Sequence, residues 1–193
     1  IVEAQHPAGG WRYEPGEEGD LSVTGWQVMA LHAAKSAGLS VPEETLERAG
    51  GFLDRVESHN GSRYRYQAGR EATPSMTAEG LLCRLFLGAA PDDPRLVEGA
   101  RWLVDEHLPQ KDDPNVYCWY YGTQLLHQVG GPAWDQWNRR MRDVLVSSQE
   151  QSGAEAGSWA PRGGHADSGG RLYMTALAAC ILEAYYRHAR LRE

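Results

Sequence analysis

Four aromatic residues within five positions are the strongest candidates for a binding site. They are Tyr117, Trp119, Tyr120 and Tyr121. So many aromatic side chains exceed what one packed helix face can hold, and we expect some of them to point into a cavity or groove. Aromatic walls beside an acid and a base would suit an amphiphile, a sugar or a peptide. The alternative is that the four side chains only pack against one another in the interior.

Residues that bind metals or act as nucleophiles are present, but without the spacing of a known type of site. Cys83, Cys118 and Cys180 are far apart among apolar neighbours. We expect reduced core thiols rather than disulfides or a metal site, and such thiols do not indicate a cellular compartment. His165 and Asp167 form a metal-like pair in a Gly-rich loop, where a solvated histidine is the simpler interpretation. We expect no bound metal and no other cofactor.

The composition of the chain is that of an ordinary globular domain. Its 193 residues are 41% hydrophobic and 23% charged, which is enough for one domain with a core. A formal net charge of −7 without a basic patch argues against a nucleic-acid partner. The longest apolar run, residues 175–182, is much shorter than the roughly 20 residues of a transmembrane helix. Because the chain does not begin with Met, we expect residues 1–193 to be a single domain within a larger protein.

The elements that must position these residues are helices of two kinds. Amphipathic helices with one polar face are predicted after Ser40, where Ser40 and Glu43 form a capping box, after Asp93 and after Gly131. Helices with little charge and apolar residues on nearly every side are predicted at 21–37, 75–87, 117–129 and 172–186. No stretch alternates apolar and polar residues for long enough to be a strand. The sequence therefore predicts an all-α fold.

The two kinds of helix alternate along the chain, which predicts two layers. Helices that are apolar on every side must lie inside, and the amphipathic helices must cover them. The pattern favours helical hairpins that curve into an arc or ring over a four-helix bundle. Further candidates for the ligand-binding set stand at early positions of the predicted inner helices, comparable to those of the aromatic group. They are Trp26, Glu79, Arg171 and Tyr173.

A short motif marks the end of the predicted hairpins. Its fullest copies run from Gln5 to Trp11 (QHPAGGW) and from Gln149 to Trp159 (QEQSGAEAGSW), with a weaker copy after Glu57. These segments resemble the Q-W repeat of squalene and oxidosqualene cyclases and of protein prenyltransferase β subunits. Longer stretches, such as GDLSVTGWQVMAL and YCWYYGTQLL, look like uncharacterised bacterial cyclase-like repeat domains.

The resemblance implies an α/α toroid, in which inner helices surround a cavity and outer helices cover them. With about seven predicted helices, this chain would be a partial toroid. Its open edges would be covered by the rest of a larger protein or by self-association. The motif itself would be structural: Gln149 would hydrogen-bond backbone groups left over at helix ends, and Trp159 would seal the joint.

The residues that carry chemistry in this family are not matched in this chain. Cyclases protonate an alkene or an epoxide with the middle acid of a D-x-D-D-T motif, and in the closest match, residues 20–24, Ser22 stands at that position. A serine hydroxyl is too weak an acid for this step. In the alignment with prenyltransferases, Tyr117 and Met174 stand where two zinc ligands would be. The remaining candidate acids are Asp20, which we expect to act as a helix N-cap, and Glu79.

The expected function is a binding or scaffold domain without catalysis, whose aromatic-lined cavity holds an apolar or amphiphilic small molecule. Two alternatives would make the chain an enzyme. One is an isoprenoid cyclase of the squalene–hopene type, with Asp20 or Glu79 as a displaced acid. The other is a polysaccharide-active toroid enzyme, which as a glycosidase would need two carboxylates about 5–9.5 Å apart across the cavity.

Overall fold

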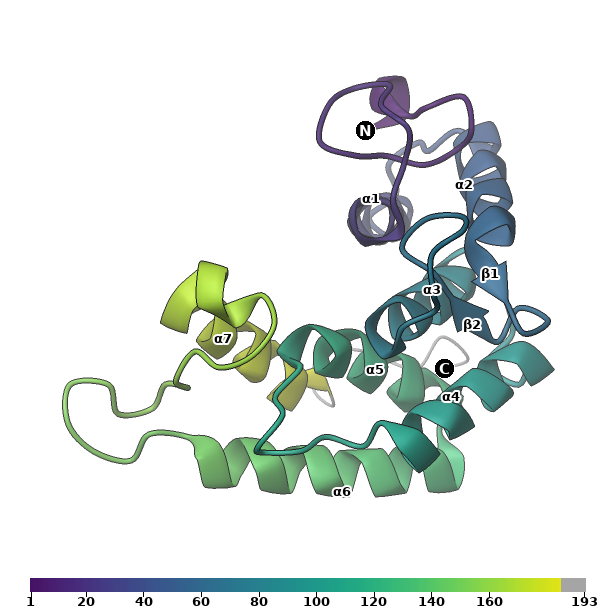
Figure 1. Ribbon diagram of the computed structural model, residues 1–193. Helices are drawn as coiled ribbons and strands as arrows, with labels where there is room; N and C mark the ends of the chain where they lie inside the picture. Colours follow the sequence, from purple (N-terminus) through teal and green to yellow (C-terminus); the bar gives the residue numbers. More distant parts are fainter. Residues whose placement is uncertain (185–193) are drawn as a thin grey trace. The chain divides into compact units, whose positions relative to one another are not determined.

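The computed structural model describes residues 1–184 and shows an all-α protein (Figure 1). This confirms the predicted fold class. The sequence predicts a single domain over residues 1–193. Within it, the chain forms two compact units, Ile1–Gly99 and Ala100–Glu193. The boundary between them falls inside helix α4 (Pro94–Glu106). The last two residues of the predicted helix at 172–186 lie outside the described residues.

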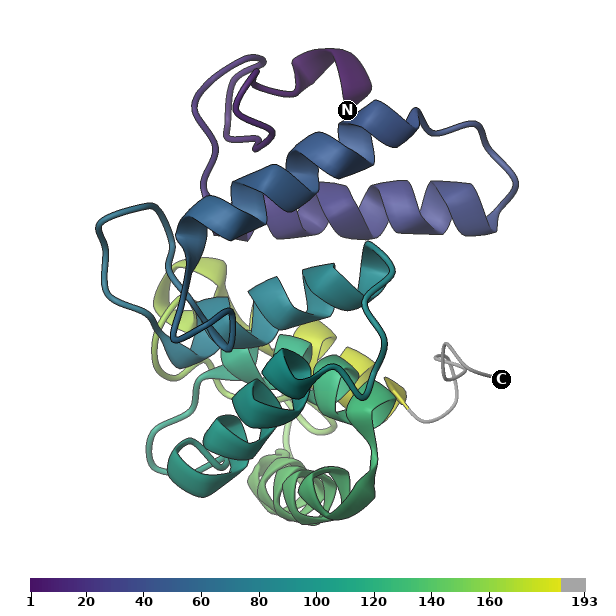
Figure 2. The same ribbon diagram turned by 90° about the vertical axis from the view of Figure 1, so that its right-hand side faces the viewer.

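The first unit is built around helix α1 (Leu21–Ser36), which packs against α2 (Glu43–Val56) and α3 (Pro74–Phe86). Figure 2 shows α1 and α2 side by side. Local signals determine the helix ends: Asp20 caps α1 as predicted, Thr73 caps α3, and Gly38 follows the end of α1 with a φ of +79°. A short 3₁₀ helix, η1 (Val2–Ala4), precedes these elements.

The second unit is built around helix α5 (Val116–Val129), which packs against α6 (Gly131–Ser148) and α7 (Ala166–Leu182). The buried side chains of α6 are those that its spacing predicts: Trp134, Trp137, Met141, Val144 and Leu145. Helix α7 is kinked at Gly170, whose φ of +69° is not helical. The kink separates a short first turn from the longer apolar part of α7.

Burial differs among the four helices that carry little charge. Helices α3 and α5 are buried on nearly every side, as predicted. For α1 and α7 the prediction is wrong, because Trp26 is 43% exposed and Leu172 is 82% exposed. Both residues lie on faces turned away from the helices that α1 and α7 contact within their own units. An apolar surface permits burial on several sides, but the number of neighbouring elements decides it.

Two local expectations are also corrected. Helix α2 begins at Glu43 with Pro42 as its N-cap and without a capping side chain, so Ser40 lies too far away for the predicted capping box. Residues predicted to form no strand contain a short antiparallel pair, β1 (Glu57–Ser58) and β2 (Arg63–Tyr64). The turn at residues 59–61 has positive φ angles, which bring the chain back on itself within a few residues.

Candidate functional site

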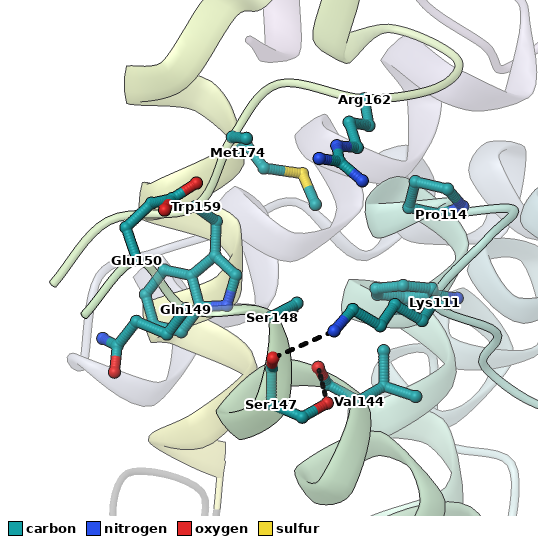
Figure 3. Close-up of a pocket in the computed structure, with 12 residues that line it drawn as sticks. Lys111, Pro114, Val144, Ser147, Ser148, Gln149, Glu150, Trp159, Arg162 and Met174 are labelled. Carbon is teal, nitrogen blue, oxygen red and sulfur yellow. Dashed lines mark hydrogen bonds between the residues drawn. The ribbon is translucent and has the colours of Figure 1, made fainter. Parts of the chain in front are cut away.

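A pocket of about 250 Å³ lies in the second unit, between the end of α6 and the loops that precede α5 and α7 (Figure 3). Its apolar wall includes the indole rings of Trp119 and Trp159 and the side chain of Met174. Both tryptophans are almost fully buried. Because the indole N–H of Trp159 already donates to the carbonyl oxygen of Leu145 (2.8 Å), Trp159 offers the pocket an apolar ring rather than a donor.

The pocket also carries charged groups. Lys111 and Arg162 lie on one side, and Glu150 lies on the other side next to Trp159 (Figure 3). The ammonium group of Lys111 donates to the carbonyl oxygen of Ser147 (3.1 Å), close to the end of α6. Carbonyl groups at a helix C-terminus lack helical partners and attract cations, so this bond holds Lys111 at the pocket.

Sequence reasoning missed Lys111, Glu150 and Arg162. All three lie outside the helices, at residues where no hydrophobic period indicates direction or burial. The only available signal was the presence of basic residues in the Pro- and Gly-containing loops before α5 and α7, and that signal is weak.

Of the four aromatic residues predicted to bind a ligand, Trp119 lines this pocket. The other three contact one another: the Tyr121 ring is edge-on to Tyr117, with centroids 5.0 Å apart, and to Tyr120, with centroids 5.1 Å apart. Tyr121 is fully buried, and burial raises the pKa of Tyr120. The tyrosines therefore pack together, whereas Trp119 reaches the pocket.

Two further candidates, Arg171 and Tyr173, lie on α7 outside this pocket. Arg171 forms an ion pair with Glu155 (2.6 Å) and donates to Ser158 Oγ (3.0 Å), so it ties α7 to the loop before it. Tyr173 is half-buried, and burial raises its pKa. The contacts of Arg171 connect structural elements, and neither Arg171 nor Tyr173 lines the pocket.

The last two candidates, Trp26 and Glu79, lie in the first unit. Glu79 is fully buried on α3, where its carboxylate lies against Gly25 of α1. A Cβ at position 25 would overlap that carboxylate, so α1 needs glycine at this point. Burial, and then the charge of Glu79, raise the pKa of the Cys83 thiol well above its ordinary value. Trp26 is exposed on α1.

Asp20 is fully buried, and its side-chain contacts are structural. Its Oδ1 accepts from the backbone N–H of Val23 (2.9 Å), which confirms the predicted N-cap. Its Oδ2 accepts from the Tyr66 hydroxyl (2.7 Å) and lies 3.3 Å from Nε of Arg12. Both carboxylate oxygens are therefore engaged in holding the start of α1 against the neighbouring loops.

The bond between Tyr66 and Asp20 predicts a stability change at alkaline pH. Burial, followed by the hydrogen bond to Asp20, raises the pKa of Tyr66 from 10.0 to about 12. Because folding favours the protonated phenol, its contribution is complete below pH 10.0 and is lost as the pH rises through about 12. We expect Tyr66→Phe to lower the free energy of unfolding by about 1 kcal/mol at neutral pH. The difference from the unchanged protein should shrink as the pH rises through about 12, as measured by urea unfolding.

Tyr13→Phe is the matched control for this experiment, because Tyr13 is 75% exposed. The charge of Tyr13 is a lesser cause of the raised pKa of Tyr66, after burial and Asp20, so Tyr13→Phe should change the pH dependence much less than Tyr66→Phe does. A constant difference between Tyr66→Phe and the unchanged protein from neutral pH to above pH 12 would contradict the assigned role of the Tyr66 hydroxyl.

The two full copies of the motif, residues 5–11 and 149–159, form joints between a helix end, a turn and the next helix. In the second copy, the side-chain amide of Gln149 donates to the carbonyl oxygen of Gly157 (2.9 Å). The indole of Trp159 donates to Leu145, and its backbone N–H donates to Thr175 Oγ1 (3.2 Å). Leu145 lies in the last turn of α6, so the tryptophan, and not the glutamine as predicted, satisfies a carbonyl group left over at the helix end.

The first copy makes the same three bonds with corresponding residues. The amide of Gln5 donates to the carbonyl oxygen of Gly9 (2.9 Å), and the indole of Trp11 donates to that of Ile1 (2.8 Å). The backbone N–H of Trp11 donates to Thr24 Oγ1 (3.1 Å). Because the same bonds recur, the motif has a structural role in both units.

Metal-ligating residues are not grouped in residues 1–184. No set of three or more His, Cys, Asp or Glu side chains in this range could hold a metal ion. His165 stands at the start of α7, with its ring 5.7 Å from that of Tyr117. Cys83 and Cys118 are free and buried as predicted, but Cys180 is exposed. Within the same residues, none of the helices is both long and apolar enough to span a membrane.

No protein-family model matches the sequence, and no curated protein matches it.

Proposed function

We propose that this chain is a binding domain without catalytic activity. It is built from Q-W-type helical hairpins like those of terpenoid cyclases and protein prenyltransferases, arranged as a partial α/α toroid. The ligand is a small amphiphilic molecule, and its site is the pocket lined by Trp119 and Trp159.

The composition of that pocket is the observation that supports the proposal. Two buried indole rings and Met174 form an apolar wall, and a few charged groups surround it. Six of its twelve lining residues are apolar and six are polar or charged, so the pocket offers an apolar surface together with polar groups, which suits an amphiphilic ligand. The volume of about 250 Å³ is slightly below the roughly 300–1,000 Å³ of common ligand pockets, which favours a small ligand.

The surroundings of the candidate acids favour binding over catalysis. The carboxylate oxygens of Asp20 are engaged by the helix cap, by Tyr66 and by Arg12. Glu79 lies against Gly25 in the first unit, among packed side chains. An acid that protonates a substrate must reach it, and neither carboxylate lines the pocket proposed here.

Filling the pocket is expected to abolish binding. Ala160 is half-buried and lines the pocket, so the ring of Ala160→Phe would occupy the space of a ligand. We expect the unchanged chain to bind 2-naphthoate, 2-naphthamide or both, and Ala160→Phe to bind neither. Isothermal titration calorimetry measures the binding of each probe to both proteins, and circular dichroism checks that the variant is folded.

The matched control is Ala156→Phe, because Ala156 is exposed on the same loop and does not line the pocket. It should bind the probes like the unchanged chain. If neither probe binds, or if Ala160→Phe binds as well as the control, the proposed site is wrong. Formation of a cyclised product from squalene would overturn the assignment as non-catalytic and favour the displaced-acid cyclase.

A further inference from the structure

We infer that the pocket selects organic monoanions, such as carboxylates with a flat apolar body, through the side chains of Lys111 and Arg162. The inference rests on the proposed binding function and adds the class of ligand. The carboxylate lies between the two cations, and the apolar body lies against the indole wall.

In the part of the chain that the structure describes, no partner uses the N–H donors of the Arg162 side chain. Within residues 1–184 its side chain makes no hydrogen bond and no ion pair, and Figure 3 shows its guanidinium group directed into the pocket. A guanidinium group has five N–H donors in a planar arrangement that matches a carboxylate with two parallel bonds. A bound carboxylate would satisfy donors that now face solvent.

Lys111 supplies the second positive charge. Its ammonium group has three donors, and one of them is used by the carbonyl oxygen of Ser147. The other two remain for a ligand. Since the bond to Ser147 fixes the ammonium group at the pocket, binding there costs less side-chain entropy than at a free surface lysine.

A close backbone approach places both cations on the same side of one pocket. Gly163, next to Arg162, has a φ of +72° and lies so close to the carbonyl oxygen of Pro114 that a Cβ would overlap it. The loop before α7 is therefore packed against the loop before α5, which carries Lys111. The pair of cations follows from this packing and not from their separation in the sequence.

Glu150 limits the charge of the ligand. It lies across the pocket from the two cations and makes no side-chain hydrogen bond or ion pair within residues 1–184. The formal charges of Lys111, Arg162 and Glu150 sum to one positive charge, which a monoanion neutralises. A dianion such as a phosphate monoester would in addition be repelled by the carboxylate.

Matched probes test the inference. By calorimetry at low salt and neutral pH, we expect the unchanged chain to bind 2-naphthoate at least about tenfold more tightly than neutral 2-naphthamide. Arg162→Gln should remove most of that difference while leaving 2-naphthamide binding unchanged. Glu150→Gln should raise the affinity for 2-naphthyl phosphate several-fold relative to that for 2-naphthoate. Arg142→Gln is the control. It removes the same positive charge as Arg162→Gln, but Arg142 lies on α6 outside the pocket.

The outcomes separate this inference from the proposed function. If 2-naphthoate and 2-naphthamide bind equally and Ala160→Phe abolishes both, the pocket binds small molecules but does not select anions, and only the inference fails. If Arg142→Gln weakens 2-naphthoate binding as much as Arg162→Gln, a general charge effect replaces the specific contact. If neither probe binds, the proposed function fails as well.

Discussion

Gly9→Ala is expected to lower the free energy of unfolding by about 3 kcal/mol, because it combines backbone strain with overpacking. Gly9 has a φ of +88°, a region that residues with a Cβ rarely adopt. A Cβ at this position would also overlap the carbonyl oxygen of Arg48 in α2. A backbone atom within a helix cannot move aside as the end of a side chain can. The displacement would break the bond from Gln5 to the Gly9 carbonyl oxygen.

Gly157→Ala is the matched control for this effect. Gly157 has the corresponding position in the second copy of the motif, with a φ of +83°, but no atom lies within 4 Å of a Cβ built on it. Its substitution should cost only the backbone strain, about 1 kcal/mol. Urea unfolding followed by circular dichroism measures both variants. Equal losses of unfolding free energy in the two variants would show that overlap with the Arg48 carbonyl oxygen adds nothing to the cost of Gly9→Ala.

Trp137→Ala is expected to cost about 3–5 kcal/mol, as large-to-small substitutions in a core do. Trp137 is fully buried on α6, and its ring lies against Gly122 of α5, where a Cβ would be only 2.7 Å from the ring. Its indole N–H donates to Thr123 Oγ1 (2.9 Å). The substitution therefore leaves a cavity between α5 and α6 and removes the partner of a buried hydroxyl.

Trp26→Ala serves as the comparison, because Trp26 is an exposed tryptophan on a helix of similar composition. We expect a loss below about 1 kcal/mol for this variant. Both free energies come from the same urea unfolding experiment. A loss for Trp26→Ala as large as that for Trp137→Ala would indicate that Trp26 is buried in solution.

Where a signal was local, the sequence predicted the structure well. Asp20 caps α1 as expected, because an N-cap bond joins groups only three residues apart, and Thr73 caps α3 in the same way. The apolar spacing of α6 predicted which of its residues are buried, since a helix with one apolar stripe has only one face to bury.

Where the outcome depended on which elements meet, sequence reasoning was incomplete. Trp26 and Trp119 both lie on helices with little charge, yet the first is exposed and the second is buried. Composition describes the surface of a helix and not the number of its neighbours. The same reason explains Cys180, which was expected to be a core thiol and is exposed.

The sequence by itself determined the helices, most of their ends and the repeated joint, because these depend on hydrophobic period and on bonds between residues close together in the chain. Tertiary structure alone decided the pocket. Lys111 and Arg162 belong to different loops without any period, and they share a site only because Gly163 allows its loop to approach Pro114 closely. Contacts of this kind depend on the packing of the whole unit, which no short stretch of sequence specifies.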